Sequence, residues 1–202
     1  MLAEPVLVRG LISTAGLSSL AFGAAAYLPM LMVHTLHMDV ATLGWLVLPL
    51  VAGSGIGSAI GGLRAHHART EVIGWLTATI GVLTCLVPHI WSLTVGGALV
   101  GIGVGIGMPT IFVRLQDAIS GGSEAVTSGF VQFARNAGAA LGAPLYGVGL
   151  MLPVVLSISL LLTFLFMSVA AIGGLILCWA GIIGVSSYNP VHKPSREDKA
   201  TE

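Results

Sequence analysis

The sequence predicts an all-α membrane protein with six transmembrane helices, and three observations support this fold class. Of the 202 residues, 55% are hydrophobic and only 8% are charged, whereas soluble domains carry about 25% charged residues. The mean hydropathy is +0.98, and a soluble core of this size could not bury so much apolar surface. The apolar residues also gather into runs of about 20 residues, the length that crosses a bilayer as a helix.

Six apolar runs are separated by short segments that contain polar residues or proline. The first run could also be a cleaved signal peptide, but it continues to Val33, which favours a spanning helix. We expect residues 186–202 to form a polar tail without regular structure. The predicted transmembrane domain covers residues 1–185, with spans at about 11–33, 43–63, 72–87, 90–113, 125–150 and 153–185.

The fourth span contains a glycine-rich stretch from Gly96 to Pro109, which reads GGALVGIGVGIGMP. Gly97, Gly101 and Gly105 recur at intervals of four, so they share one face of a helix. In lipid the backbone must form its own hydrogen bonds, and a glycine face lets two helices approach closely. The spacing does not fit the G-x-G-x-x-G pattern of nucleotide-binding loops.

Small residues form similar stripes on the second and fifth spans, again at intervals of four. Scattered glycines are common in membrane helices, but ordered stripes favour close packing. Proline adds bending, because it removes a backbone hydrogen bond. We therefore predict close packing or gating at Gly53, Gly57, Gly61, Gly97, Gly101, Gly105, Pro109, Gly138, Gly142 and Pro144.

The basic residues outside the predicted spans all fall on one side of the membrane. They precede the first span, follow the second and fourth, or lie in the tail, namely Arg9, Arg64, Arg69, Arg114, Lys193, Arg196 and Lys199. The positive-inside rule makes that side cytoplasmic, so both termini are expected inside, as an even number of spans requires. The net charge is zero, so the sequence does not indicate a nucleic-acid partner.

Four segments, in this order and spacing, resemble the C-terminal six-helix half of a major facilitator superfamily transporter. The nearest resemblance is to the fourteen-helix drug:proton antiporters of multidrug efflux. Residues 22–29 read FGAAAYLP and residues 44–49 read GWLVLP, similar to the family's FGAxxYLP and GLLLLP. Residues 101–109 resemble GLGLGLxMP, and residues 125–142 resemble ATSG followed by FFRxLGGxLG. The resemblance implies a multi-pass protein of the cell membrane that exports small molecules by alternating access.

The chain also departs from the family pattern. The loop from Gly61 to Arg69 resembles the gating motif GRLxDRxGxR, but Ala65 stands at the aspartate position and Ala68 at the later glycine position. This change argues against a charge-relay gate in the loop. The family's N-terminal half has no counterpart in this sequence. We therefore expect either a fragment or a half that assembles with an N-terminal half or a second copy.

Arg135 lies about ten residues into the fifth span, where an arginine costs about 2.5–3.5 kcal/mol at the membrane centre. Such a residue usually faces a cavity or a partner. Gln132, Arg135 and Asn136 share one helix face, so we predict that they line the cytoplasmic half of a substrate pathway. The alternative is that the span begins later and that Arg135 reaches the interface or pairs with Glu124 or Asp117.

Tyr27 is the fourth predicted pathway residue, because its ring and hydroxyl could contact a lipophilic substrate. The alternative is an interfacial tyrosine near a helix end. His34, His37 and Asp39 are metal-ligand types in one short loop, but three solvated polar residues explain them better. We expect no metal, no cofactor and no enzymatic activity, since no nucleophile motif or paired intramembrane carboxylates occur.

The predicted spans contain no Asp or Glu, although proton-coupled transport needs a titratable group along its pathway. We therefore predict export of small, lipophilic or cationic compounds, coupled to protons only together with an N-terminal half. The expected partners are the substrate, the lipid bilayer and that second half. The alternative function is a non-transporting membrane scaffold, whose glycine faces would serve assembly alone.

Overall fold

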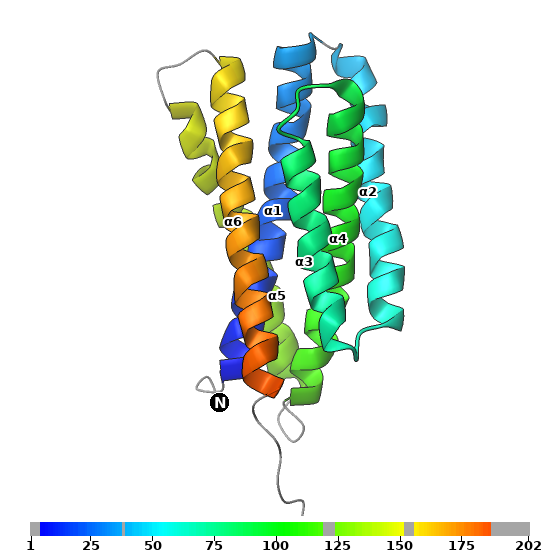
Figure 1. The fold of residues 1–202 in the computed structure, drawn as a ribbon, viewed down its shortest axis with the longest axis vertical. Helices are drawn as coiled ribbons and strands as arrows, with labels where there is room; N and C mark the ends of the chain where they lie inside the picture. The colour runs from blue at the N-terminus through cyan, green and yellow to red at the C-terminus, as the bar shows by residue number, and fades with distance from the viewer. Residues whose placement is uncertain (1–4, 38, 119–123, 152–155, 187–202) are drawn as a thin grey trace, which may run out of the picture.

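In the computed structural model, the described residues form six α-helices and one 3₁₀-helix, which pack into a single bundle (Figure 1). The structure describes residues 5–37, 39–118, 124–151 and 156–186, so the predicted tail from residue 187 onward lies outside the described residues. The helices are α1 (Pro5–Leu36), α2 (Val40–Leu63), α3 (Ala68–Thr84), α4 (Ile90–Ala118), α5 (Glu124–Gly147), the 3₁₀-helix η1 (Val148–Met151) and α6 (Leu156–Ser186).

Each predicted span overlaps one α-helix, and the fifth also extends over η1. Helix α1 begins six residues before the predicted span and so includes Arg9, while α4 continues five residues past its predicted end to Ala118. Three of the described helices are long and apolar enough to cross a membrane, within residues 7–34, 90–117 and 158–180. Prolines inside α1, α2, α4 and α5 interrupt single backbone bonds without ending these helices.

The helices form two layers, as their contacts and Figure 1 together show. One layer is a row in which α2 packs on α4, α4 on α1, and α1 on α5. The second layer consists of α3 and α6, which lie in front of α4 and α1 in Figure 1 and contact each other. Among the described elements, no helix covers the other face of the row.

Helices α2 and α4 pack closely because glycines of each helix contact the backbone of the other. A Cβ atom at Gly53, Gly57 or Gly61 would lie within 3 Å of the carbonyl oxygens of Ala98, Ile102 and Ile106, one helical turn apart. In return, Gly101 and Gly105 face the carbonyls of Leu50 and Ser54 on α2. Only glycine permits this approach, because any side chain would push the two backbones apart.

Glycines also allow close packing of α5 on α1. A Cβ at Gly138 would meet the backbone of Ala15, and a Cβ at Gly142 would meet that of Ser19. Gly97 is packed less closely than Gly101 and Gly105. The atoms nearest to a Cβ there belong to side chains, Leu28 of α1 at 3.4 Å and Leu50 of α2 at 3.9 Å. Gly97 therefore lies between α1 and α2 without touching the backbone of either.

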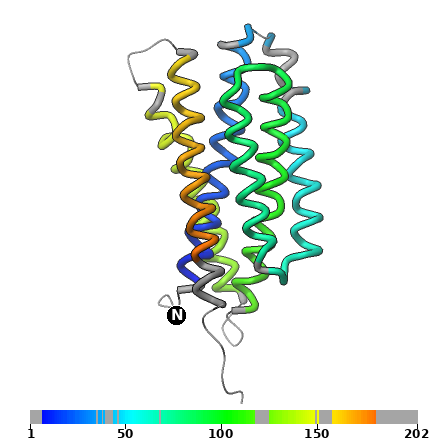
Figure 2. Tube along the Cα trace, in the orientation of Figure 1, coloured from blue at the N-terminus to red at the C-terminus, as the bar shows by residue number. Residues whose placement is uncertain are grey.

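Helix α1 begins and helix α6 ends at the same end of the bundle, as the trace in Figure 2 shows. The loop between α2 and α3, with Arg64 and Arg69, also lies at this end, and Arg114 lies four residues before the end of α4. The described members of the basic group, Arg9, Arg64, Arg69 and Arg114, therefore share one end of the folded bundle. We call this the basic end.

Candidate functional site

The predicted pathway residues on α5 project from the outer side of that helix. Val131, Ala134 and Gly138 are buried against the bundle, whereas Gln132, Arg135 and Asn136 are exposed, and we call these three residues the α5 face. The Gln132 Nε2 group donates a hydrogen bond to Asn136 Oδ1 at 3.2 Å. The spacing-based expectation that these side chains share one face is therefore met.

Arg135 lies eleven residues after the start of α5, or about 16 Å along the helix axis. Its suggested partner Asp117 is instead 3.4 Å from Nδ1 of His66, in an exposed contact at the basic end. None of the other side chains that the structure describes forms an ion pair with Arg135. The suggested pairing with Glu124 lies outside the described side chains.

Tyr27 connects α1 to α5 through its hydroxyl group. The hydroxyl donates a hydrogen bond to the carbonyl oxygen of Ala143 at 2.5 Å, one residue before Pro144 inside α5. One turn away from this contact, the hydroxyls of Ser19 and Tyr146 lie 2.8 Å apart and form a second polar link. The Tyr27 hydroxyl thus contributes to the packing of α1 against α5.

A buried carboxylate, Glu71, lies at the basic end, one residue before the third predicted span. Helix α3 begins at Ala68, so Glu71 belongs to its first turn and is only 8% exposed. A carboxylate in the first turn is favoured, because the helix N-terminus carries partial positive charge.

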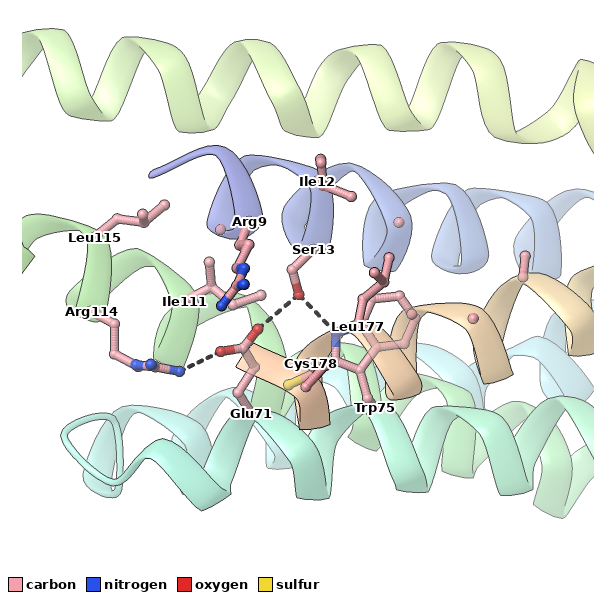
Figure 3. A pocket seen from close by; sticks show the side chains of 16 residues that line it. Arg9, Ile12, Ser13, Glu71, Trp75, Ile111, Arg114, Leu115, Leu177 and Cys178 are labelled. Atoms are coloured by element: carbon pink, nitrogen blue, oxygen red, sulfur yellow. Dashed lines mark hydrogen bonds and ion pairs between the residues drawn. The ribbon is translucent and has the colours of Figure 1, made fainter. Parts of the chain in front are cut away.

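Side chains from α1 and α4 donate hydrogen bonds to this carboxylate (Figure 3). Arg114 of α4 donates from Nη1 to Glu71 Oε2 at 2.6 Å. Ser13 of α1 donates from Oγ to Glu71 Oε1 at 2.8 Å and accepts a hydrogen bond of 2.8 Å from Trp75 Nε1. We call Ser13, Glu71, Trp75 and Arg114 the Glu71 cluster. Both carboxylate oxygens have a donor, so the charge of Glu71 is balanced within the bundle.

The Glu71 cluster forms one wall of a cavity of about 390 Å³ between α1, α3, α4 and α6. Arg9, which was predicted to precede the first span, lines this cavity from within α1. Most of the remaining lining is apolar or glycine. No pattern in the sequence pointed to this cavity, because its residues come from four separate helices.

The loop that resembles the family's gating motif is held by local hydrogen bonds. Thr70 Oγ1 donates to the Arg64 carbonyl at 2.9 Å, and the His67 amide donates to the same oxygen at 3.0 Å. Ala65, at the aspartate position of the motif, is buried. Among the residues that the structure describes, His34, His37 and Asp39 do not form a group that could hold a metal ion.

Comparison with known proteins agrees with this architecture. Among curated protein sequences, none matches the chain. The chain is similar in structure to the peptide transporter POT, crystallised in complex with sulfate, with a TM-score of 0.74 and 20% sequence identity. The match covers 96% of this chain and 42% of POT, so the chain spans less than half the length of that transporter.

The family model of the major facilitator superfamily matches residues 11–202. The chain is therefore an integral membrane protein that belongs to the major facilitator superfamily.

Proposed function

We propose that the chain is the C-terminal half of a transporter of the cell membrane that exports small, lipophilic or cationic compounds. The transporter would work by alternating access, in which two six-helix halves rock about a central site. In this arrangement both termini of the chain are cytoplasmic, and the basic end of the bundle faces the cytoplasm. Family membership supports transport, and the resemblance to drug:proton antiporters supports the substrate class.

The observation that carries the proposal is the exposed polar face of α5. Polar side chains exposed to lipid are unfavourable, and an arginine in a span usually faces a partner or water. Gln132, Arg135 and Asn136 would therefore line the substrate pathway between the two halves. The ring of Tyr27, which is half-buried beside α5, would contribute to the same wall.

The partner that closes this pathway is an N-terminal half or a second copy. The two-layer arrangement supports this, because α3 and α6 cover one face of the row and leave the other for a facing bundle. The length comparison supports it as well, since the chain corresponds to 42% of the structurally similar transporter.

Proton coupling would depend on carboxylates of the partner half. Glu71 is a buried carboxylate in this chain, but Ser13 and Arg114 occupy both of its oxygens and it lies away from α5. Liposomes that contain only this polypeptide are therefore expected to show no proton-driven export. Robust export by the chain alone would contradict this assignment.

The scaffold alternative is less well supported, because the glycine faces are used inside the chain. The stripes at Gly57 and Gly105 pack α2 and α4 against each other, and that at Gly138 packs α5 on α1. Assembly with other proteins through glycine stripes would need such faces on the outside of the bundle.

Cysteine labelling in native membranes tests the pathway. In a background with Cys85→Ala and Cys178→Ala, Arg135→Cys is expected to react with a water-soluble thiol reagent from the cytoplasmic side. The matched control is Ile80→Cys on α3, because Ile80 is 48% exposed and the polar side chains beside it, Thr77 and Thr84, bind backbone carbonyls of their own helix. If Arg135→Cys is as unreactive as this lipid-facing control, the α5 face does not line a pathway.

A further inference from the structure

We infer that the cavity beside the Glu71 cluster binds an anionic phospholipid from the leaflet at the basic end of the bundle. The phosphate would lie against Arg9, and an acyl chain would occupy the apolar part of the cavity. This site is separate from the proposed pathway, because none of the described lining residues comes from α2 or α5. Its existence does not depend on the transport function.

The charges of the cavity favour an anion. Arg114 is paired with Glu71, and Ser13 occupies the second carboxylate oxygen. Arg9 has no such partner among the described residues, and its side chain extends along the cavity beside this pair in Figure 3. The lining therefore carries one net positive charge. A guanidinium group presents a planar fork of donors that fits phosphate oxygens.

The rest of the lining favours a ligand with a hydrocarbon chain. The cavity volume of about 390 Å³ is much larger than a phosphate group requires. Away from the charged residues the walls consist of apolar side chains and glycines, including Ile12, Trp75, Ile111, Gly173 and Leu177. A free inorganic anion would leave these apolar surfaces without a partner, whereas an acyl chain would cover them.

The depth of the cavity fits a lipid headgroup. Arg9 lies four residues after the start of α1, and Arg114 lies four residues before the end of α4. Both are thus about 6 Å from the helix ends, where the membrane interface meets the bundle. Basic pockets between transmembrane helices at this level are typical sites for acidic headgroups.

Native mass spectrometry of the purified full-length chain tests the charge requirement. Phosphatidylglycerol is expected to bind more tightly than phosphatidylcholine of the same chain length. The Arg9→Gln variant should weaken phosphatidylglycerol binding about fivefold, the effect expected for one basic residue near the headgroups. Arg64→Gln is the matched control, because Arg64 is exposed at the same end but does not line the cavity.

A second variant tests the cavity itself. A Cβ at Gly173 would meet nothing within 4 Å, so Gly173→Leu can fill the cavity without displacing the backbone. It should reduce phosphatidylglycerol binding at least as much as Arg9→Gln. Gly62→Leu is the control, since Gly62 also has open space around its Cβ but lies on α2 outside the cavity.

Two results would overturn the inference. If both Arg9→Gln and Gly173→Leu bind phosphatidylglycerol like the unchanged chain, the cavity does not hold the lipid. If glycerol phosphate, which has no acyl chains, binds as tightly as phosphatidylglycerol and Gly173→Leu has no effect on either, the site takes a free anion instead. The labelling of Arg135→Cys is independent of both results, so a failure here is distinguishable from a failure of the transport proposal.

Discussion

The Glu71 cluster and the α5 face are two polar regions of one apolar bundle, and their side chains differ in what they bind. In the Glu71 cluster, side chains from α1, α3 and α4 bind one another and are largely buried. On the α5 face, the hydrogen bond between Gln132 and Asn136 joins two exposed residues of one helix. Buried polar groups that are fully paired hold helices together, whereas exposed polar groups in a membrane helix are available for a substrate or partner.

The largest effect is expected from Glu71→Ala. This change leaves Arg114 half-buried without its carboxylate and removes the acceptor of Ser13, so we expect a loss of about 3 kcal/mol in unfolding free energy. The measurement is a denaturant titration of the chain in detergent, followed by circular dichroism. Glu71→Gln is the control, which keeps the shape and one acceptor and should be less destabilising. Equal stability of Glu71→Ala and the unchanged chain would show that the cluster does not hold the helices together.

A smaller effect is expected from Ser13→Ala, which deletes the hydroxyl that joins Trp75 to Glu71. The buried indole N–H of Trp75 then lacks an acceptor, and the expected loss is about 2 kcal/mol in the same titration. Trp75→Phe removes the donor instead and leaves the bond from Ser13 to Glu71 intact. It should therefore cost about 1 kcal/mol from the lost hydrogen bond. If Trp75→Phe proves more destabilising than Ser13→Ala, packing of the indole rather than this polar link dominates.

The smallest effect on stability is expected from Asn136→Ala on the α5 face. Asn136 is exposed and binds only Gln132. The unfolding free energy of the Asn136→Ala chain should therefore differ from that of the unchanged chain by no more than about 0.5 kcal/mol. Export by the assembled transporter should nevertheless fall, because the side chain would face the substrate. Ala140→Ser is the control on the same helix. A large loss of stability with unchanged export would mean that Asn136 holds the structure together and does not contact the substrate.

The glycine packing was largely predictable, whereas the partners of individual glycines were not. Intervals of four at Gly53, Gly57 and Gly61 indicate one helix face, and small residues on such a face favour close contact. The same spacing places Gly97 with Gly101 and Gly105, although the atoms nearest to a Cβ at Gly97 belong to the side chains of Leu28 and Leu50 and not to a backbone. Spacing identifies a face, but it does not identify which helix that face meets or how far along the contact extends.

The candidate site was predicted in part for a similar reason. The common face of Gln132 and Asn136 depends only on helical periodicity within one segment, and the structure contains their hydrogen bond. The engagement of the Tyr27 hydroxyl by Ala143 depends on two segments 116 residues apart. No local rule distinguishes a tyrosine that faces a pathway from one that binds a neighbouring helix.

The sequence by itself determined the membrane class, the approximate helices and the end at which the basic residues gather. These properties follow from hydropathy, helical periodicity and charge order, all of which are local along the chain. Only the tertiary structure decided that Glu71 is buried, that it binds Ser13 and Arg114, and that Arg9 lines a cavity. Glu71 is 58 residues from Ser13 and 43 from Arg114, so their contact exists only because the packing of α1, α3 and α4 turns the three side chains towards one another.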